Sequence, residues 1–581
     1  MPLFNDIVSL YELTKKKIHE ILMLNEDSIK ENVHKWRIFF IEHLPGSIRE
    51  DILCYGFSKY DSKIRRPSYP LSYWVPFSVV LFDKRIKYVP SIFINDLEKD
   101  LPLLISFVTY LWTYRPKINR LFMNLVYVYK NCSRWNICMN SIQWSRNILC
   151  KCFEEGLASN LVQLQLTYQC NDSILIAIGR NSKCLKMLDV SCSSTITIDG
   201  IKSFLFKDLN TFQNDMLNGS EIQVYTFLKC IIENREILNT VCFTLEEIRL
   251  QYTKPNNKGW IFILSCVQSL KHLGWPGKWN MKKIIMTVWN EIMKPKKFNL
   301  ESITLSDWDI TCDEIYTINE CLPLLKNLNT TLTRSYEPIN YINHQQSTKF
   351  WNKLNSLTLY IENTIEYFQI FCRNGYIQNL SELTIKSVFP DISFDLALLQ
   401  SGCPNLIVLD IASVLLHINL KPTGKFQYLK TVKMEAPFEE TKTWFLFHGC
   451  PSLEELQIFN EMDPEYWKKI FITPPPIICH QMKRLEIVFV LPNGNPTFLI
   501  QPYIMNYSII TEFIRKCSVL NTFGSILNFG MSTQDVENIH NFKQIFVFFF
   551  CQLGKVNLAW PAERGIKGAR VKWTLGRLGA K

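Results

Sequence analysis

Apolar residues repeat along most of this chain in one phrase, Leu-x-x-Leu-x-Leu, at intervals of roughly 23–30 residues. A clear copy is Leu161-Val-Gln-Leu164-Gln-Leu166. The thirteen copies begin at Leu161, Leu185, Leu245, Leu270, Leu300, Leu325, Leu354, Leu380, Leu406, Leu429, Leu453, Met482 and Leu520. A fixed period of this length is typical of a solenoid, in which each unit packs only against its neighbours. The pattern therefore predicts a long surface for binding.

Each phrase predicts one short strand. Alternating apolar residues place their side chains on one face of the strand, and the residues between them face outward on the concave side. The first Leu packs into the same core from the preceding turn, and the rest of the unit returns along the convex side, usually as a helix. The outward positions are mixed polar with no dominant charge: Gln163, Gln165, Lys186, Asp189, Thr358, Asp410, Glu454, Glu455 and Gln457.

One interval is about twice the usual length. It runs from Leu185 to Leu245 and contains either one poorly matching repeat or an insertion. Within it, the polar stretch Asn210–Glu221 includes an Asn-Gly pair and predicts an exposed loop.

Cysteines occur in register with the repeat, one to four residues before the first Leu of a phrase: Cys184, Cys266, Cys321, Cys403, Cys450 and Cys517. A small, soft apolar residue suits the turn between a returning helix and the next strand. A metal site needs clustered ligands, whereas these thiols are spread one per repeat. We therefore expect structural cysteines, with no metal ligands and no cofactor.

The stretch Cys184-Leu-Lys-Met-Leu-Asp-Val-Ser-Cys192, followed by Ile198-Asp199-Gly200-Ile201, resembles the cysteine-containing subtype of the leucine-rich-repeat family that is common in F-box/LRR proteins. The resemblance covers roughly residues 157–525. It implies an α/β leucine-rich-repeat solenoid (horseshoe) of roughly 12–13 repeats with an N-terminal helical segment, and a function in protein binding.

The position of the repeats divides the chain into four segments. Residues 1–60 are expected to be helical. Residues 61–156, which are rich in aromatic residues and proline, predict an irregular or helical N-terminal cap. The repeat array occupies residues 157–540, and residues 541–581 form an atypical basic C-terminal tail.

Composition narrows the functional classes. Hydrophobic residues make up 47% of the chain and charged residues 20%, which is enough apolar material for a continuous core. The net charge is +11, but residues 563–581 supply +5 of it, so we expect no nucleic-acid partner.

No apolar run approaches the ~20 residues of a membrane-spanning helix. The odd count of 19 cysteines and the absence of a signal-peptide pattern indicate a cytoplasmic or nuclear protein.

The N-terminal segment begins with an amphipathic helix, expected over residues 6–24. Part of its sequence resembles the elongin-binding box of the SOCS/VHL-box families: Ser9-Leu10-Tyr-Glu-Leu13-Thr14-Lys-Lys-Lys-Ile18. Thr14 stands where those families usually have cysteine. The resemblance implies that Leu10, Thr14 and Ile18 contact elongin B/C.

A second motif follows at Leu44-Pro45-Gly-Ser-Ile48, where Pro45 predicts a helix start. It resembles the Leu-Pro-x-x-aliphatic motif that selects a cullin, although the spacer between the two boxes is longer than in compact SOCS boxes. The resemblance implies that Leu44, Pro45 and Ile48 contact a cullin.

These resemblances predict a substrate-recognition subunit of a cullin–RING ubiquitin ligase, with a protein substrate on the concave face. An F-box/LRR receptor that uses a Skp-type adaptor is one alternative, because an F-box also opens on Leu-Pro and helices. The other is a plain leucine-rich-repeat scaffold with no ligase role. The chain contains no P-loop, dinucleotide-binding, zinc-protease or serine-nucleophile motif, so we do not expect an enzyme.

Overall fold

A computed structural model describes the chain as two compact units. Unit 1 comprises residues 1–306 and 320–324, and unit 2 comprises residues 307–319 and 325–581. The structure describes residues 10–61, 75, 78–89, 91–93, 97–124, 135–233, 235–254, 257–274, 280–305, 318–332, 353–361, 366–373, 375, 377–387, 393–412, 415–417, 425–435, 447–460, 464–489, 507–524 and 546–548.

The described part of unit 1 contains a ladder of parallel strands, with successive strands of the ladder paired. The strands are β1 (Ile92–Phe93), β2 (Arg120–Asn124), β3 (Gln163–Thr167), β4 (Met187–Asp189), β5 (Glu247–Arg249), β6 (His272–Leu273) and β7 (Ser302–Leu305). Equivalent phrase positions are in register: Gln163 pairs with Met187, and Met187 with Glu247.

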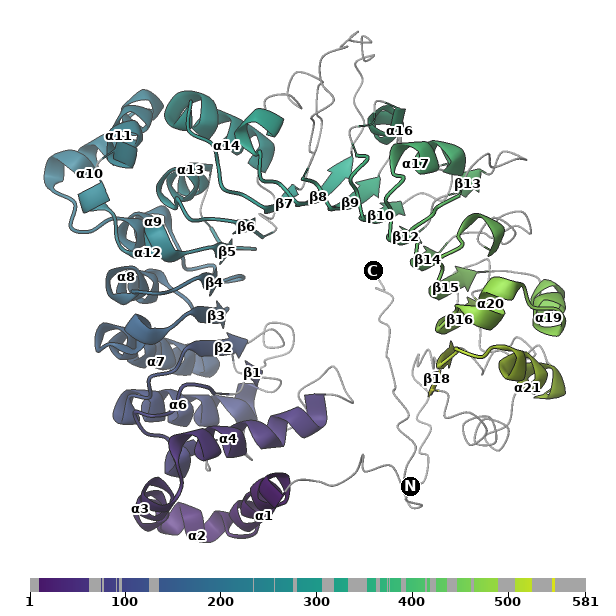
Figure 1. The fold of residues 1–581 in the computed structure, drawn as a ribbon. Coiled ribbons are helices and arrows are strands. Elements are labelled where there is room, and N and C mark those ends of the chain that lie inside the picture. The colour runs from purple at the N-terminus through teal and green to yellow at the C-terminus, as the bar shows by residue number, and fades with distance from the viewer. Residues whose placement is uncertain are drawn as a thin grey trace. The chain divides into compact units, whose positions relative to one another are not determined.

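The returning segments of unit 1 are mostly helical and lie along one side of the ladder (Figure 1). They are α6 (Leu97–Tyr114), α7 (Trp135–Glu154), η2 (Leu157–Asn160), α8 (Asp172–Asn181), α9 (Ile198–Leu205), α12 (Val241–Thr244), α13 (Asn257–Cys266), α14 (Met281–Val288) and the π-helical turn η4 (Trp289–Met293). Side-chain caps fix where some of them begin. The Asn171 side chain accepts a hydrogen bond from the Ile174 N–H at 3.0 Å and so satisfies a free donor in the first turn of α8.

Four helices precede the ladder: α1 (Leu10–Leu24), α2 (Glu26–Glu31), α3 (Val33–His43) and α4 (Gly46–Asp61). Helix α1 packs against α4, and α2 against α3. The first helix agrees with the expected amphipathic segment from residue 10 onward, while residues 6–9 lie outside the described part. Pro45 immediately precedes α4, and its carbonyl accepts the Arg49 N–H at 3.1 Å, so the predicted helix start is confirmed.

The long interval between Leu185 and Leu245 is an insertion, because β4 pairs directly with β5. The chain leaves the repeat at Phe206 and returns to it at Leu238. These two residues pair in an antiparallel bridge. Between them lie α10 (Thr211–Asn218), α11 (Glu221–Glu233) and η3 (Arg235–Ile237).

The expected loop over residues 210–221 is therefore mostly helix, and that prediction was wrong. Asn210 and Gln213 form a reciprocal capping box, in which each side chain accepts the other's backbone N–H, at 2.8 and 3.1 Å. This start signal outweighs the polar composition of the stretch.

Unit 2 repeats the same construction. Its ladder of parallel strands consists of β8 (Asn327–Leu332), β9 (Ser356–Ile361), β10 (Glu382–Ser387), β12 (Val408–Ala412), β14 (Thr431–Glu435), β15 (Glu455–Asn460), β16 (Arg484–Phe489), β17 (Thr522–Gly524) and β18 (Phe546–Phe548). A separate pair, β11 (Ser393–Asp395) and β13 (Leu415–His417), is also parallel. The described helices are α16 (Glu366–Arg373), α17 (Leu396–Gly402), α19 (Pro464–Ile472), α20 (Pro476–His480) and α21 (Tyr507–Lys516).

The repeat phrase accounts for the core of both units. The first apolar residue of each of the thirteen phrases is buried, with at most 4% of its surface exposed, and a ladder strand follows each one. Five of the six in-register cysteines are fully buried, and Cys184 is half-buried. Each unit is therefore an α/β solenoid of the leucine-rich-repeat type, as the period of the sequence predicted.

The ladder extends beyond the segment in which the repeat was recognised. Strands β1 and β2 lie within residues 61–156, where we expected a cap. Their short apolar runs lack the spacing of the phrase, but Leu121 and Met123 are fully buried and β2 is in register with β3. At the other end, β18 lies within the expected tail of residues 541–581 and pairs with β17. Residues 549–581 lie outside the described part.

Candidate binding surfaces

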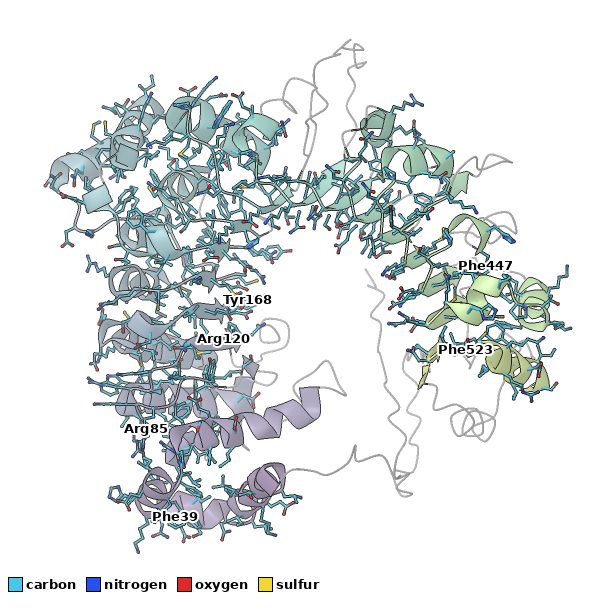
Figure 2. The ribbon with its side chains drawn as sticks, in the orientation of Figure 1. Phe39, Arg85, Arg120, Tyr168, Phe447 and Phe523 are labelled. Carbon is cyan, nitrogen blue, oxygen red and sulfur yellow. The ribbon has the colours of Figure 1, made fainter. Side chains whose placement is uncertain are left out.

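The outward-facing side chains of the unit 1 strands form small charged clusters. Figure 2 draws the side chains of this ladder and labels Arg120 of β2 and Tyr168. On β5, the Arg249 guanidinium binds the Glu247 carboxylate at 2.6 Å. Asp189 of the neighbouring strand lies 4.0 Å from the same guanidinium, and its other oxygen accepts the Ser191 N–H at 3.0 Å. Acid and base are thus interleaved on this face.

The unit 2 strands have the same mixed character. Lys433 lies 3.8 Å from the Asp410 carboxylate on the adjacent strand. Arg484 binds Glu486 at 2.6 Å on β16. Glu486 is almost fully buried, and this burial raises the pKa of its carboxyl even though Arg484 acts in the opposite direction. A face that alternates charge in this way suits a protein surface better than a polyanion.

A row of alternating charges crosses unit 1 immediately before the strands. Lys186, Glu246 and Lys271 occupy the same position in three successive repeats. The Glu246 carboxylate binds Lys186 at 2.9 Å and Lys271 at 3.0 Å. Hydrogen bonds from these two lysines lower the pKa of Glu246.

The equivalent position in unit 2 carries the same sequence of charges. Glu454 binds Lys483 at 2.5 Å and Lys430 at 3.5 Å, and the hydrogen bond from Lys483 is the main cause of its lowered pKa. In unit 1 the next repeat places Glu301 at the same position, so that row holds two lysines and two glutamates, whereas Lys430, Glu454 and Lys483 leave one excess positive charge in unit 2.

Strand ends in unit 1 share an unusual turn. Tyr168, Cys192 and Tyr252 each follow a strand at the same register position, and all three have left-handed backbone with φ of 67°, 62° and 55°. For residues other than glycine this conformation costs on the order of 1 kcal/mol or more. Backbone hydrogen bonds hold the turns: Tyr168 N–H donates to the Ser191 carbonyl at 3.1 Å, and Cys192 N–H to the Gln251 carbonyl at 2.5 Å. The column of three side chains is thus set by the repeat geometry.

The elongin-box residues lie on α1. Leu10, Thr14 and Ile18 are four residues apart, which places them in one stripe along the helix. Thr14 is exposed and Ile18 half-buried, while the side chain of Leu10 lies outside the described part.

The cullin-motif residues lie at the junction of α3 and α4. Pro45 is exposed, whereas Leu44 and Ile48 are half-buried. The two motifs belong to the same helical group, because α1 packs against α4.

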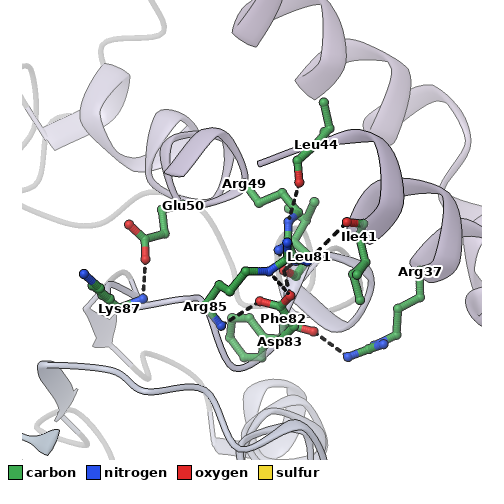
Figure 3. A network of polar contacts seen from close by, with 10 residues as sticks. All are labelled: Arg37, Ile41, Leu44, Arg49, Glu50, Leu81, Phe82, Asp83, Arg85 and Lys87. Carbon is green, nitrogen blue, oxygen red and sulfur yellow. Dashed lines mark hydrogen bonds and ion pairs between the residues drawn. The ribbon is translucent and has the colours of Figure 1, made fainter. Parts of the chain in front are cut away.

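This helical group is joined to the start of the solenoid by a buried arginine (Figure 3). The Arg49 side chain on α4 is completely buried. Its Nε donates to the Leu44 carbonyl at 3.1 Å, one Nη to the Leu81 carbonyl at 2.8 Å, and the other Nη to the Asp83 carboxylate at 2.8 Å. The guanidinium thus ties the α3–α4 junction to residues 81–83.

Further contacts reinforce this joint. Arg85 binds Asp83 at 2.8 Å and donates to the Ile41 carbonyl at 3.2 Å. Arg37 of α3 donates to the Phe82 carbonyl at 2.6 Å and lies 4.0 Å from the centre of the Tyr114 ring. Burial raises the pKa of the Asp83 carboxyl, but the hydrogen bonds from Arg49 and Arg85 outweigh it, and the pKa is lowered. Sequence reasoning missed this network, because no local pattern connects Arg49 with a carboxylate 34 positions away.

The N-terminal helices also expose large apolar side chains. The exposed fractions on α1 are 50% for Leu13, 38% for Ile21 and 82% for Leu24, and on α3 they are 41% for Ile38 and 51% for Phe39. Phe39 is labelled among the N-terminal helices in Figure 2. Helical geometry brings the three α1 residues onto one side of that helix. Concentrated apolar exposure of this kind marks interaction sites in soluble proteins.

In the described residues, no three or more His, Cys, Asp or Glu side chains gather as a metal site. Burial raises the pKa of Cys321 and Cys450 to about 12, so both thiols stay protonated near neutral pH. Among the described helices, none is both long and apolar enough to cross a membrane.

Comparison with known proteins adds little. No protein-family model matches the chain, and no curated protein matches it. Among solved structures, a chain from the crystal structure of the mouse RP105/MD-1 complex is similar over 80% of this chain and 81% of that chain, with 12% identity and a TM-score of 0.26. A likeness at that TM-score carries no argument, so the fold assignment rests on the strand register.

Proposed function

We propose that this protein is a non-enzymatic receptor: its repeats bind a protein, and its N-terminal helices dock an adaptor of a cullin–RING ubiquitin ligase. The observation that carries the proposal is the apolar exposure of α1 and α3. Leaving Leu13, Leu24 and Phe39 in water is unfavourable, at ~25 cal/mol per Å² of apolar surface, and a partner that covers them removes this cost.

The joint at Arg49 supports the same function. A receptor acts by proximity, because it raises the local concentration of a bound substrate beside an enzyme carried by other subunits. Proximity depends on orientation, so the docking helices should be fixed to the binding surface. The buried guanidinium and its carbonyl partners Leu44 and Leu81 provide such a fixed attachment.

The identity of the adaptor rests on the resemblance of residues 9–18 to an elongin box. By this proposal Leu10 and Ile18 insert into elongin B/C, Thr14 occupies the position usually held by cysteine, and the Leu44–Ile48 motif contacts a cullin. A hydroxyl in place of a thiol keeps the size of the side chain but makes it more polar. We therefore expect weaker adaptor binding than a cysteine would give.

Co-purification of the full chain with elongin B/C tests the proposal. Wild type should retain elongin B/C, Leu10→Ala/Ile18→Ala should lose it, and Thr14→Cys should strengthen it. Ile222→Ala on α11 is the matched control, because this apolar residue is 77% exposed but lies outside the docking helices.

Several outcomes would contradict the elongin assignment: no capture by wild type, or equal capture by the double variant. Capture of a Skp-type adaptor in its place would favour the F-box alternative. If α1 variants lose no partner at all, the chain is a plain scaffold, which the mixed polar strand faces also permit. Point variants are preferable to deletion of residues 1–60, because deletion would also remove Arg49 and leave Asp83 without that partner.

A further inference from the structure

A groove of about 500 Å³ lies in unit 1 where strands β4–β7 begin. It is lined by Lys183, Lys186, Glu246, Lys271 and Glu301, together with the apolar side chain of Phe243. Binding pockets for ligands or peptide side chains typically measure about 300–1,000 Å³. We propose that this groove binds an acidic segment of a protein partner. This inference rests on the proposed function of the chain as a protein receptor.

Charge is the first argument. Three lysines and two glutamates line the groove, which leaves an excess of one positive charge. Glu246 is shared by Lys186 and Lys271 at 2.9 and 3.0 Å, so one carboxylate serves two ammonium groups. Lys183 is exposed at the rim. A carboxylate from a partner would restore the balance of charge here, whereas a basic segment would increase the repulsion.

The lining is also suited to hold a peptide. Phe243 and Leu324 offer partly exposed apolar surface for one apolar side chain of the segment.

Side chains in the lining are held in place by the neighbouring repeat. The Ser269 hydroxyl donates to the Leu245 carbonyl at 2.8 Å, and the Asn299 amide donates to the Gln268 carbonyl at 2.9 Å. These bonds link successive turns under the groove. Side chains that are already ordered before binding lose less conformational entropy when a partner binds.

Nucleic acid is the other anionic candidate, and the lining disfavours it. Glu246 and Glu301 would face the phosphates, and a single excess charge releases few counterions. A peptide can place its carboxylates beside the lysines and leave neutral residues opposite the glutamates. The occupant that fits this alternation is therefore a protein segment with spaced acidic residues and one apolar side chain.

Fluorescence anisotropy with the full chain tests the groove. The probe is a short labelled peptide of alternating Glu and Gly with one Leu at its centre, and its counterpart has Gln in place of every Glu. We expect the Glu peptide to bind at least tenfold more tightly than the Gln peptide. Lys183→Gln/Lys271→Gln should weaken it about tenfold, because the variant removes two of the three lysines that line the groove.

Lys296→Gln/Lys297→Gln is the matched control, because it removes the same charge from an exposed turn outside the groove. Three outcomes would overturn the proposal: equal binding of the Glu and Gln peptides, an equal loss in the control variant, or tighter binding of a single-stranded oligonucleotide that depends on Lys183. Elongin capture is measured separately with the wild-type chain. If wild type captures elongin B/C but binds the Glu and Gln peptides equally, only the groove is rejected. If wild type prefers the Glu peptide but captures no elongin B/C, only the adaptor is rejected.

Discussion

At the scale of single residues, Arg49 has the most consequential environment. It is buried without water contact, and all three of its guanidinium nitrogens donate hydrogen bonds. A buried charge is tolerated only when it is paired and hydrogen-bonded, and Asp83 supplies the pairing. The planar fork of arginine reaches two carbonyls and a carboxylate together, which the single ammonium of lysine cannot do.

Arg49→Met is therefore expected to loosen α3 and α4 from residues 81–83. The substitution removes one of the two arginines that bind Asp83 and takes the Arg49 donors away from the Leu44 and Leu81 carbonyls, at a cost of ~3–5 kcal/mol. Hydrogen exchange should report the loss as reduced protection of α3 and α4 amides. Arg515→Met, which removes an exposed ion pair with Glu512, should change protection in α21 by less than ~1 kcal/mol. Equal protection of α3 and α4 in wild type and Arg49→Met would contradict the role of the network.

At the scale of elements, helix caps decide structure that composition misses. Helix α10 lies in a polar stretch whose residues favour a loop, yet the box formed by Asn210 and Gln213 satisfies donors at its start. The excursion that contains α10 and α11 is closed at its base by the bridge between Phe206 and Leu238. The buried Asn239 amide also donates to the Phe204 and Phe206 carbonyls at 2.9 and 3.0 Å. The ladder continues undisturbed, because the insertion begins and ends at adjacent points.

Asn210→Ala is expected to destabilise α10 by about 1 kcal/mol, because it removes the acceptor for the Gln213 N–H. Amide exchange in residues 211–218 should then be about fivefold faster, whereas exchange in α8 should stay unchanged. Asn214→Ala, an exposed position inside the same helix, provides the control and should show little effect or a slight slowing. Faster exchange in both variants alike would show that the capping box is not what holds the helix.

At the scale of the whole molecule, the protein offers separate surfaces on one chain. The N-terminal helices expose apolar side chains such as Leu24 and Phe39, whereas the groove before β4–β7 presents lysine and glutamate. The two surfaces therefore suit partners of different chemistry. A receptor that joins a substrate to a larger assembly requires two such surfaces.

The two surfaces should be energetically independent. Sites that share no contacts contribute additively to binding, within about 0.5 kcal/mol. A variant with Leu10→Ala, Ile18→Ala, Lys183→Gln and Lys271→Gln should therefore lose both elongin capture and peptide binding, and each parent variant only one of them. Calorimetric titration of the peptide with and without elongin B/C measures the coupling. A change in peptide affinity greater than about threefold would contradict independence.

The sequence by itself determined the repeat and its core. The spacing of Leu354, Leu357 and Leu359 is enough to predict a strand with one buried face, since side chains alternate along a strand whatever its neighbours are. The in-register cysteines could be assigned to the core in the same way. Strands β1 and β2 could not, because their period is obscured by aromatic residues and proline.

Only the tertiary structure decided which polar residues meet. Lys186 and Glu246 are neighbours because β4 pairs with β5 across a long insertion. Asp83 forms an ion pair with Arg49 because α4 packs beside residues 81–83. Hydrophobic periodicity is a local property of the chain, whereas ion pairs and grooves depend on register between distant segments. The sequence therefore predicts the scaffold, and the register determines the sites on it.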